Sequence, residues 1–271
     1  MLLRPVVRGG VAIGWPCVQA SGMKLQSPLL CAASLAFVAC AGQEYSVHIG
    51  PTFARVDGDI ALANSAGVIP PANDLNNSLG FGGPKSALVQ GQMDADRHRV
   101  RLSVMNIDTS GQSVLDNDYG DILAGTAVTG QLDFTAIVGN YSYEVVREQS
   151  YRFGLGAQLG YYTLDVNVRS ANGREDLATN GLMPMPYFEA EYFCGDFTFG
   201  AAGGIFAGHF GDSDGLYWDL ESYGIWHFDR DFDMRAGYRY LVLDGDGRAT
   251  SRDFDAAVDV QGFYVTFGYL F

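Results

Sequence analysis

The chain ends in Gly262-Phe263-Tyr264-Val265-Thr266-Phe267-Gly268-Tyr269-Leu270-Phe271, a stretch in which two kinds of side chain alternate. Every second residue, counted back from the end, is large and apolar or aromatic: Phe271, Tyr269, Phe267, Val265 and Phe263. Because successive side chains of a β-strand point to opposite faces, this segment forms a strand with one aromatic face. A soluble sheet would expose it as an aggregation-prone edge, whereas a wall between lipid and a packed interior requires this alternation.

The same two-residue period recurs upstream, most clearly over residues 151–161, 216–228 and 232–240. In each segment one face carries aromatic and aliphatic side chains, and the charged residues lie on the other face. A tilted strand needs about 9 to 11 residues to cross the hydrocarbon, and these segments are long enough. No stretch after Ala41 approaches the ~18 consecutive apolar residues of a membrane helix, so the pattern predicts an all-β chain with membrane-spanning strands.

Counting the alternating segments gives the topology. We expect about ten strands, near residues 44–56, 84–93, 97–107, 130–145, 150–168, 183–194, 197–210, 215–228, 231–244 and 257–271. Short connections alternate with longer polar ones, as short periplasmic turns alternate with longer external loops; the short ones lie at 94–96, 146–149, 195–196 and 229–230. Pro51 interrupts the first strand and the second is short, so the alternative is eight strands.

The last strand, with its final Phe, resembles the terminal strand of outer-membrane β-barrel proteins of Gram-negative-type bacteria. The alternation extends this resemblance in architecture over residues 42–271. It implies a transmembrane antiparallel up-and-down β-barrel in the outer membrane, in contact with membrane lipid and lipopolysaccharide. It also implies that Phe267, Tyr269 and Phe271 form the signal read by the barrel-assembly machinery.

The N-terminal segment is expected to be a signal peptide covering residues 1–41. From Met23, Lys24 supplies a positive charge, residues 29–38 are apolar, and Ala39-Cys40-Ala41 is a small-residue cleavage site. Residues 1–22 are either an extended charged region or the product of a misassigned start codon.

The cysteines leave one alternative open at this site. Cys40 could instead be the lipidated cysteine of a lipoprotein, although Phe37 is a poor substitute for the aliphatic residue usual three positions earlier. Cleavage after Ala41 would remove Cys17, Cys31 and Cys40 and leave Cys194 alone, so no internal disulfide is expected.

Length and charge limit the possible partners. The 271 residues fit one domain. The net charge is −14, and lysine occurs only at Lys24 and Lys85. Because phosphates would meet net repulsion, nucleic acid is not an expected partner.

Charged residues of the predicted strands lie on the face opposite the apolar one. Five are arginines and six are carboxylates: Arg99, Arg101, Arg152, Arg235 and Arg239, with Glu144, Glu189, Glu191, Asp219, Glu221 and Asp233. Side chains can fill so narrow a barrel, and buried charges are tolerated only when paired. We therefore expect a salt-bridged, closed lumen and a structural or surface-interaction role. The alternative is a narrow porin-like channel through the same network.

An enzymatic site has weaker support. Ten strands resemble the omptin proteases, and His209 lies near Asp212 and Asp214, which could set its pKa. A second aspartate pair would have to come from Asp116 and Asp118 or from Asp244 and Asp246. The other histidines fall near predicted periplasmic ends: His48, His98 and His227. We expect no enzymatic activity.

Two acidic stretches, Asp116-Asn117-Asp118 and Asp244-Gly245-Asp246-Gly247, place oxygen atoms at alternate positions as calcium loops do. Neither continues into the full loop with its distant bidentate Glu. Ordinary turn chemistry explains both, so neither a bound metal nor a cofactor is expected.

The signal-peptide assignment predicts a mature chain that begins within a few residues of Ala41. N-terminal sequencing of the membrane-bound protein measures this directly. An intact Met1 terminus would contradict export by this peptide, and a lipidated Cys40 would make the chain an anchored lipoprotein.

Overall fold

The alternating segments form long strands in the computed structural model, which describes residues 43–83, 85–210, 213–249 and 252–271. Within these ranges the strands are β1 (Gln43–Leu62), β2 (Asn73–Asp74), β3 (Lys85–Ala95), β4 (His98–Val114), β5 (Ala127–Arg147), β6 (Tyr151–Ser170), β7 (Arg174–Cys194), β8 (Phe197–Phe210), β9 (Ser213–His227), β10 (Phe232–Ala249) and β11 (Arg252–Leu270). None of the described residues forms a helix long and apolar enough to cross a membrane.

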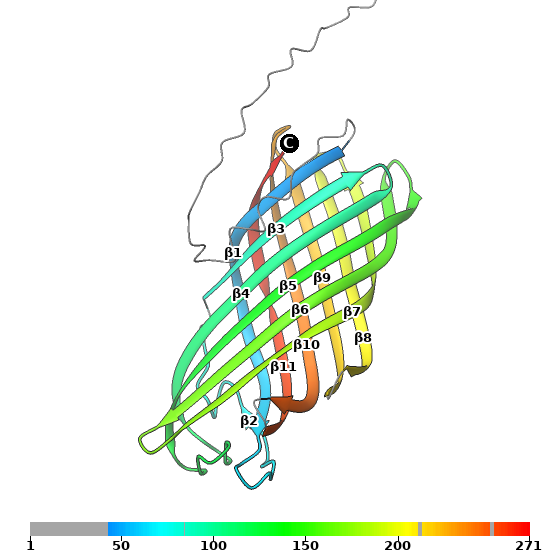
Figure 1. The fold of residues 1–271 in the computed structure, drawn as a ribbon. Coiled ribbons are helices and arrows are strands. Elements are labelled where there is room, and N and C mark those ends of the chain that lie inside the picture. The colour runs from blue at the N-terminus through cyan, green and yellow to red at the C-terminus, as the bar shows by residue number, and fades with distance from the viewer. Residues whose placement is uncertain (1–42, 84, 211–212, 250–251) are drawn as a thin grey trace, which may run out of the picture. The chain divides into compact units, whose positions relative to one another are not determined.

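The strands close into a ring of ten. Long strands that follow one another in the chain pair antiparallel, and β1 also pairs with β11, from Ser46↔Leu270 to Leu62↔Phe254 (Figure 1). The two-residue β2 pairs with β1 within the first loop. The prediction of an all-β, antiparallel up-and-down barrel of ten strands is thus confirmed. The eight-stranded alternative is wrong, because β1 and β3 pair up to Pro51↔Ala87 despite the proline.

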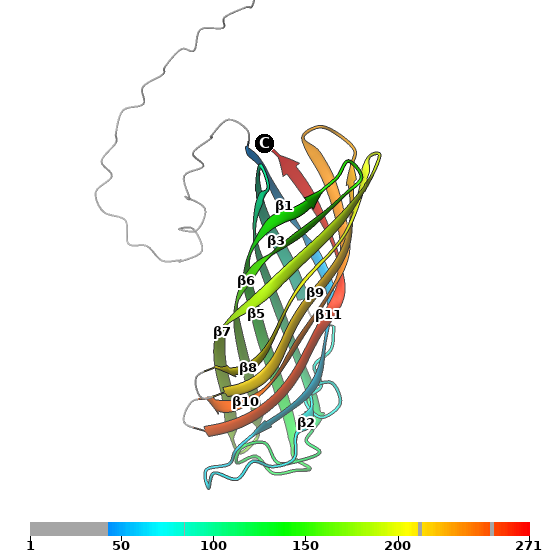
Figure 2. The same cartoon turned by 90° about the vertical axis from the view of Figure 1, so that its right-hand side faces the viewer.

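The barrel has two unlike ends, visible in Figures 1 and 2. At the terminal end β1 begins and β11 ends, and Tyr45 and Phe271 exchange backbone hydrogen bonds of 3.1 and 2.9 Å. Four short turns lie at this end, at residues 96–97, 148–150, 195–196 and 228–231, close to where the sequence indicated them. The opposite end, which holds β2, is called the loop end below.

Toward the loop end the strands run further than expected. Residues 174–182 belong to β7, and only 171–173 separate β6 from β7, where the sequence indicated a long polar loop. Asn, Asp and Gly in this segment are typical of turns, yet alternate residues still face the interior, and Leu177 is buried. The long loops expected after β6 and after Asp244 are therefore wrong, because both segments continue as hairpins.

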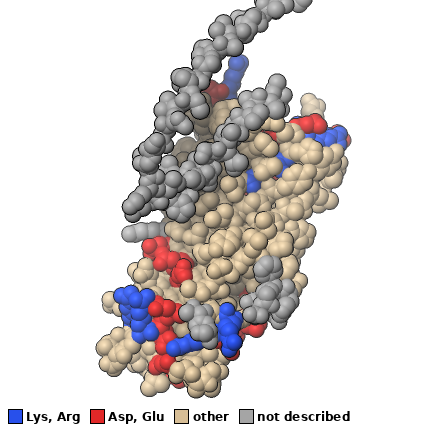
Figure 3. Space-filling view, in the orientation of Figure 1, with Lys and Arg blue, Asp and Glu red and all other residues tan. Residues whose placement is uncertain are grey.

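A belt of apolar side chains surrounds the barrel from its terminal end to about the middle of the long strands. This lipid belt comprises the outward-facing residues from Phe263 to Tyr269 on β11, from Tyr151 to Tyr161 on β6 and from Leu182 to Tyr192 on β7, and their counterparts on the other strands. Figure 3 shows a broad surface without charge there, with charged residues toward both ends. Exposed aromatic rings pair at the terminal end, as Phe197 does with Trp226, which is typical of the interfacial girdles of membrane barrels.

Beyond the lipid belt, toward the loop end, the polarity of the wall is reversed. Inward-facing residues are buried and apolar: Ile107, Leu132, Phe134, Val166, Val168, Leu177, Phe254 and Val258. The exposed Arg174 and Arg248 lie among the outward-facing residues, and exposed aspartates recur there: Asp59, Asp108, Asp165, Asp176, Asp244, Asp246 and Asp255. This part, called the loop-end extension below, is built as a soluble barrel is, with its apolar residues inside and its charges in water.

Two loops cover the loop end. Leu75 and Leu79 from the first, and Tyr119 from the loop 115–126, are fully buried. Asn73 joins the loops, because its side-chain amide donates to the carbonyl oxygen of Asp118 at 3.1 Å and accepts from the N–H of Asn117 at 2.9 Å.

Arg252 ties the second loop to the strands. Its guanidinium lies 2.6 Å from Glu175 and 3.3 Å from Asp121. Hydrogen bonds from Ser65, together with Arg252, hold the pKa of Asp121 below its ordinary value.

The expected signal peptide, residues 1–41, lies outside the described residues, and so do Cys17, Cys31 and Cys40. Cys194 is exposed and forms no disulfide.

The reversed polarity makes the interior of the extension intolerant of charge. Val166→Asp, at a position 1% exposed, should lower the free energy of unfolding at pH 7 by about 4 kcal/mol, the cost of protonating a buried carboxyl some three units above its ordinary pKa. Val114→Asp is the matched control, since Val114 is 52% exposed, and should cost less than about 0.5 kcal/mol. Urea unfolding of both variants measures the difference, and equal losses would contradict the reversed polarity.

Candidate functional site

The eleven predicted lumen residues all lie inside the barrel, within or near the level of the lipid belt. Glu221 has the most exposed side chain among them at 11%, and the other ten are at 8% or less. They come from β4, β5, β6, β7, β9 and β10. The period of each strand points these side chains inward, because the alternate positions carry the lipid belt.

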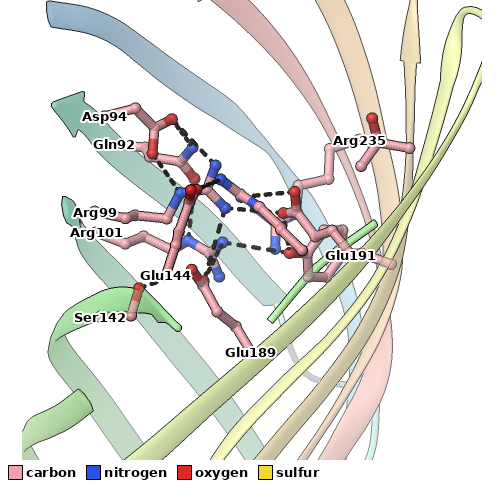
Figure 4. Close-up of polar contacts among 12 residues, drawn as sticks. Gln92, Asp94, Arg99, Arg101, Ser142, Glu144, Glu189, Glu191 and Arg235 are labelled. Atoms are coloured by element: carbon pink, nitrogen blue, oxygen red, sulfur yellow. Dashed lines mark hydrogen bonds and ion pairs between the residues drawn. The ribbon is translucent and has the colours of Figure 1, made fainter. Parts of the chain in front are cut away.

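Nearest the terminal end, two arginines share one glutamate. Arg152 lies 2.8 Å from Glu144 and 2.6 Å from Glu191. Arg99 donates to Glu191 at 2.9 Å and also binds Asp94 on the neighbouring β3. Figure 4 shows Arg99 and Asp94 on one side of the lumen and Glu191 on the other. Each guanidinium thus has two carboxylates, which buried arginines require.

The next layer crosses the lumen. Arg101 on β4 lies 3.7 Å from Glu189 on β7 and 3.4 Å from Glu221 on β9. The hydroxyl of Ser142 donates to Glu189 at 2.7 Å. These contacts join strands that are not neighbours in the sheet, so the layer holds opposite walls together.

Arg235 completes this layer from β10. Its guanidinium lies 3.0 Å from Glu221 and 3.7 Å from the centre of the Tyr223 ring. Tyr264 accepts a hydrogen bond from Arg235 at 3.0 Å and donates one to Glu221. The carboxylate of Glu221, the ring face of Tyr223 and the hydroxyl of Tyr264 together compensate the charge of this fully buried arginine.

The innermost layer is a single bidentate pair. Nε and Nη2 of Arg239 donate to the two carboxylate oxygens of Asp219 at 2.8 and 2.5 Å. Gln158 donates to the same carboxylate at 3.1 Å. This geometry is the strongest form of arginine–carboxylate contact.

Asp233 stands apart from these layers, at the terminal mouth. His48 lies 2.8 Å from its carboxylate and His227 lies 3.8 Å away. Thr198 is 3.1 Å from Nε2 of the same His227. Asp233 is therefore near two histidines, and no arginine contact is recorded for it among the described residues.

Little room remains between the layers. The void beside Arg101, Asp219 and Arg239 measures about 20 Å³, which is enough for one water molecule. On the terminal side a vestibule of about 260 Å³ leads up to Arg99 and Glu191. The vestibule therefore borders the network on that side, and only the small void lies among the layers near Arg239.

Sequence reasoning missed several members of the network. Asp94 was placed in a turn, but it lies in β3 and binds Arg99. The tyrosines Tyr223 and Tyr264 share the inward face with the charges, so their position in the alternation could have identified them as partners. His48 could not be linked to Asp233, because the two residues lie on β1 and β10 and meet only in the closed barrel.

Among the described side chains, the alternative acidic residues are not gathered into a centre. His209 and Asp214 pair across the β8–β9 hairpin, and Asp212 lies outside the described residues. Asp116 accepts a hydrogen bond from Ser78, and Asp118 accepts one from the N–H of Ala124, which is ordinary loop chemistry.

Asp244 and Asp246 lie on β10 and not in a loop, with their side chains exposed. Across the described ranges, no three His, Cys, Asp or Glu side chains are arranged to hold a metal ion.

No protein-family model and no curated protein sequence matches this chain. Among solved structures it is similar to the outer-membrane protease OmpT of Escherichia coli, with a TM-score of 0.53 and 13% identity over 85% of this chain and 96% of that one. It is also similar to the attachment invasion locus protein Ail of Yersinia pestis, with a TM-score of 0.38 and 10% identity over 85% of this chain and 99% of that one. At such identities the likeness to OmpT shows the fold alone, which is that of an outer-membrane β-barrel protein.

Proposed function

We propose that this chain is a closed barrel of the outer membrane with a structural or surface-interaction role and no enzymatic activity. The observation that supports it best is the ion-pair network, in which five buried arginines meet buried carboxylates in successive layers. Such a network stabilises the barrel wall and leaves no continuous path for ions.

Opening a pore would require several of these pairs to separate together. Removing one partner of a buried pair typically costs about 3 to 5 kcal/mol, because the other charge is left without compensation. Arg239 and Asp219 form one such pair, and Arg101 and Glu221 form another. A porin-like channel is therefore the less favourable interpretation of the same residues.

The loop-end extension is the part that would meet the outside of the cell. Its outward aspartates give it a negative surface, which suits cationic partners or divalent ions that bridge to the phosphates of lipopolysaccharide. The two covering loops are tied to each other and to the strands, so this surface is presented on a rigid support.

The proposal includes export by a cleaved signal peptide and insertion by the barrel-assembly machinery. The terminal end, with its short turns, would face the periplasm. Two observations support this location: the lipid belt, and the fold that the chain shares with OmpT.

Reversing one innermost charge tests the closed lumen. Arg239→Glu should lower the free energy of unfolding in lipid vesicles by about 3 to 5 kcal/mol, because Asp219 loses its partner and gains a like charge. Arg248→Glu is the matched control on the same strand. Arg248 pairs with Asp253, and the two side chains are 62% and 47% exposed, so this substitution should lower the free energy of unfolding by less than about 1 kcal/mol. Planar-bilayer recordings should show no steady conductance for the unaltered protein. Unchanged stability of Arg239→Glu together with an ion-selective current would replace this proposal with the channel.

The last residue offers a test of assembly. The ring of Phe271 stacks on the rings of Tyr45 and Tyr269, and its centre lies 5.9 Å from that of Tyr45 and 5.8 Å from that of Tyr269. Phe271→Asp should reduce the yield of heat-modifiable, protease-resistant barrel in the membrane severalfold without affecting export, and Phe271→Tyr should retain it. A normal yield of Phe271→Asp barrel would show that this residue is not part of an assembly signal.

A further inference from the structure

The barrel wall is interrupted between β7 and β8. β7 pairs with β6 along its whole length, from Arg169↔Arg174 to Tyr151↔Tyr192. Its pairing with β8 begins at Cys194↔Phe197 and stops at Tyr187↔Gly204, although β8 continues beside β9 to Phe210. Within the described residues, the two strands have no ladder beyond that point. In Figure 1, β7 runs away from β8 as both approach the loop end.

Prolines mark the unpaired stretch of β7. Pro184 and Pro186 both lie just beyond the last pair. Proline has no N–H to give to a neighbouring strand, so it is confined to edges within sheets. A strand edge that is open toward hydrocarbon leaves backbone N–H and C=O groups without partners. Because Pro184 and Pro186 have no N–H, this edge of β7 has two fewer donors to satisfy.

The gap opens onto lipid. On the β7 side the outward residues next to it are Leu182, at 43% exposed, and the two prolines. On the β8 side the outward residue is Ile205, at 50% exposed. These residues belong to the lipid belt on its loop-end half, so the interruption begins within the hydrocarbon and continues into the loop-end extension.

Behind the gap lies an apolar cavity of about 100 Å³. Most of its lining is apolar and includes Phe134, Met183, Leu243, Phe254 and Val258, and the polar residues Thr179, Asn180 and Asp246 also line it. The described lining contains residues of β5, β6, β7, β9, β10 and β11 but none of β8. β8 is missing from the lining where it has left β7. The cavity and the gap are therefore one lateral recess.

The recess has a floor. Phe134 and Tyr162 stack with ring centres 6.4 Å apart. On the terminal side of them lies the layer of Gln158, Asp219 and Arg239. An apolar molecule that entered from the side would meet paired charges there and go no further, so the recess can hold a ligand but does not conduct one.

We propose that this recess binds the end of a hydrocarbon chain of a membrane lipid, which enters sideways through the gap between β7 and β8. A polar solute would leave most of its groups without partners, because apolar side chains outnumber Thr179, Asn180 and Asp246 in this lining. A volume of about 100 Å³ is smaller than the 150 Å³ cavity that admits benzene, so it suits the thin end of a chain whose remainder stays in the bilayer. The inference depends on the proposed membrane location and not on whether the lumen is closed.

Photo-crosslinking tests the recess. The full mature chain is folded into phospholipid vesicles containing a trace of phosphatidylcholine with a diazirine at the end of one acyl chain. Mass spectrometry after illumination should find label on inward-facing Met183, Leu243 and Phe254, and on outward-facing Phe263 of the lipid belt. Label on Phe263 alone would overturn the inference and keep the membrane location, whereas no label on Phe263 would overturn the location.

Filling the recess provides the matched comparison. A Cβ at Gly181 would meet only the end of Met183, at 3.0 Å, so Gly181→Phe places a ring in the cavity. It should reduce label on Leu243 and Phe254 at least tenfold and leave label on Phe263 unchanged. Gly91→Phe is the control, because nothing lies within 4 Å of its Cβ position.

If Gly181→Phe does not fold, Ala256→Phe fills the same cavity from β11. Undiminished lumen label in the folded filling variant would contradict the recess. Lumen label from a free diazirine fatty acid, but not from the phospholipid, would contradict the lipid as its source.

Discussion

Arg101 and Glu221 meet across the lumen at the level of the lipid belt. Neither charge can exchange its partner for bulk water there, so each has to be compensated by groups of the chain itself. The remaining layers follow from the same constraint: Arg99 and Arg152 share Glu191, and Arg239 takes both oxygens of Asp219. Because these contacts join β4 to β7 and β9, they supply the interior contacts that a hydrogen-bonded ring of strands lacks.

The interior therefore has two zones with different physical origins. Near the terminal end the outer face needs apolar residues for lipid, and the inner face carries charges that pair with one another. In the loop-end extension the outer face is in water, and the inner face is an apolar core that includes Leu132, Phe134 and Val166. Phe134 and Tyr162 lie at the boundary, where the aromatic layer covers the innermost ion pair. The recess between β7 and β8 lies on the apolar side of this boundary.

The alternation of side chains was enough to predict the inward charges and to limit the number of strands to ten or eight, because a period of two assigns each residue to one face whatever the rest of the chain does. It was less informative at the loop end. Segments such as 174–182 alternate weakly and contain turn-forming residues, so their continuation as hairpins depends on pairing with β6, which is a tertiary effect. Apolar and polar side chains alternate with the same period of two on both sides of the polarity reversal. The period alone therefore does not show which face of the strand contacts lipid. The contacts of His48 and Arg252 depend on closure of the ring and have no local signal.

In the proposed membrane location, the reversal of polarity also sets how deep the barrel sits. Moving the barrel toward the terminal end by two residues, roughly 5 Å for tilted strands, would carry Asp108 and Asp165 toward the hydrocarbon from several strands at once. Each aspartate near the interface opposes this by less than about 1 kcal/mol, and a ring of them acts together. At the other end, Phe232 and Tyr269 hold the aromatic girdle at the headgroups. With both edges of the belt marked in this way, the barrel is matched to one thickness of bilayer, and a thicker or thinner membrane would have to deform to accommodate it.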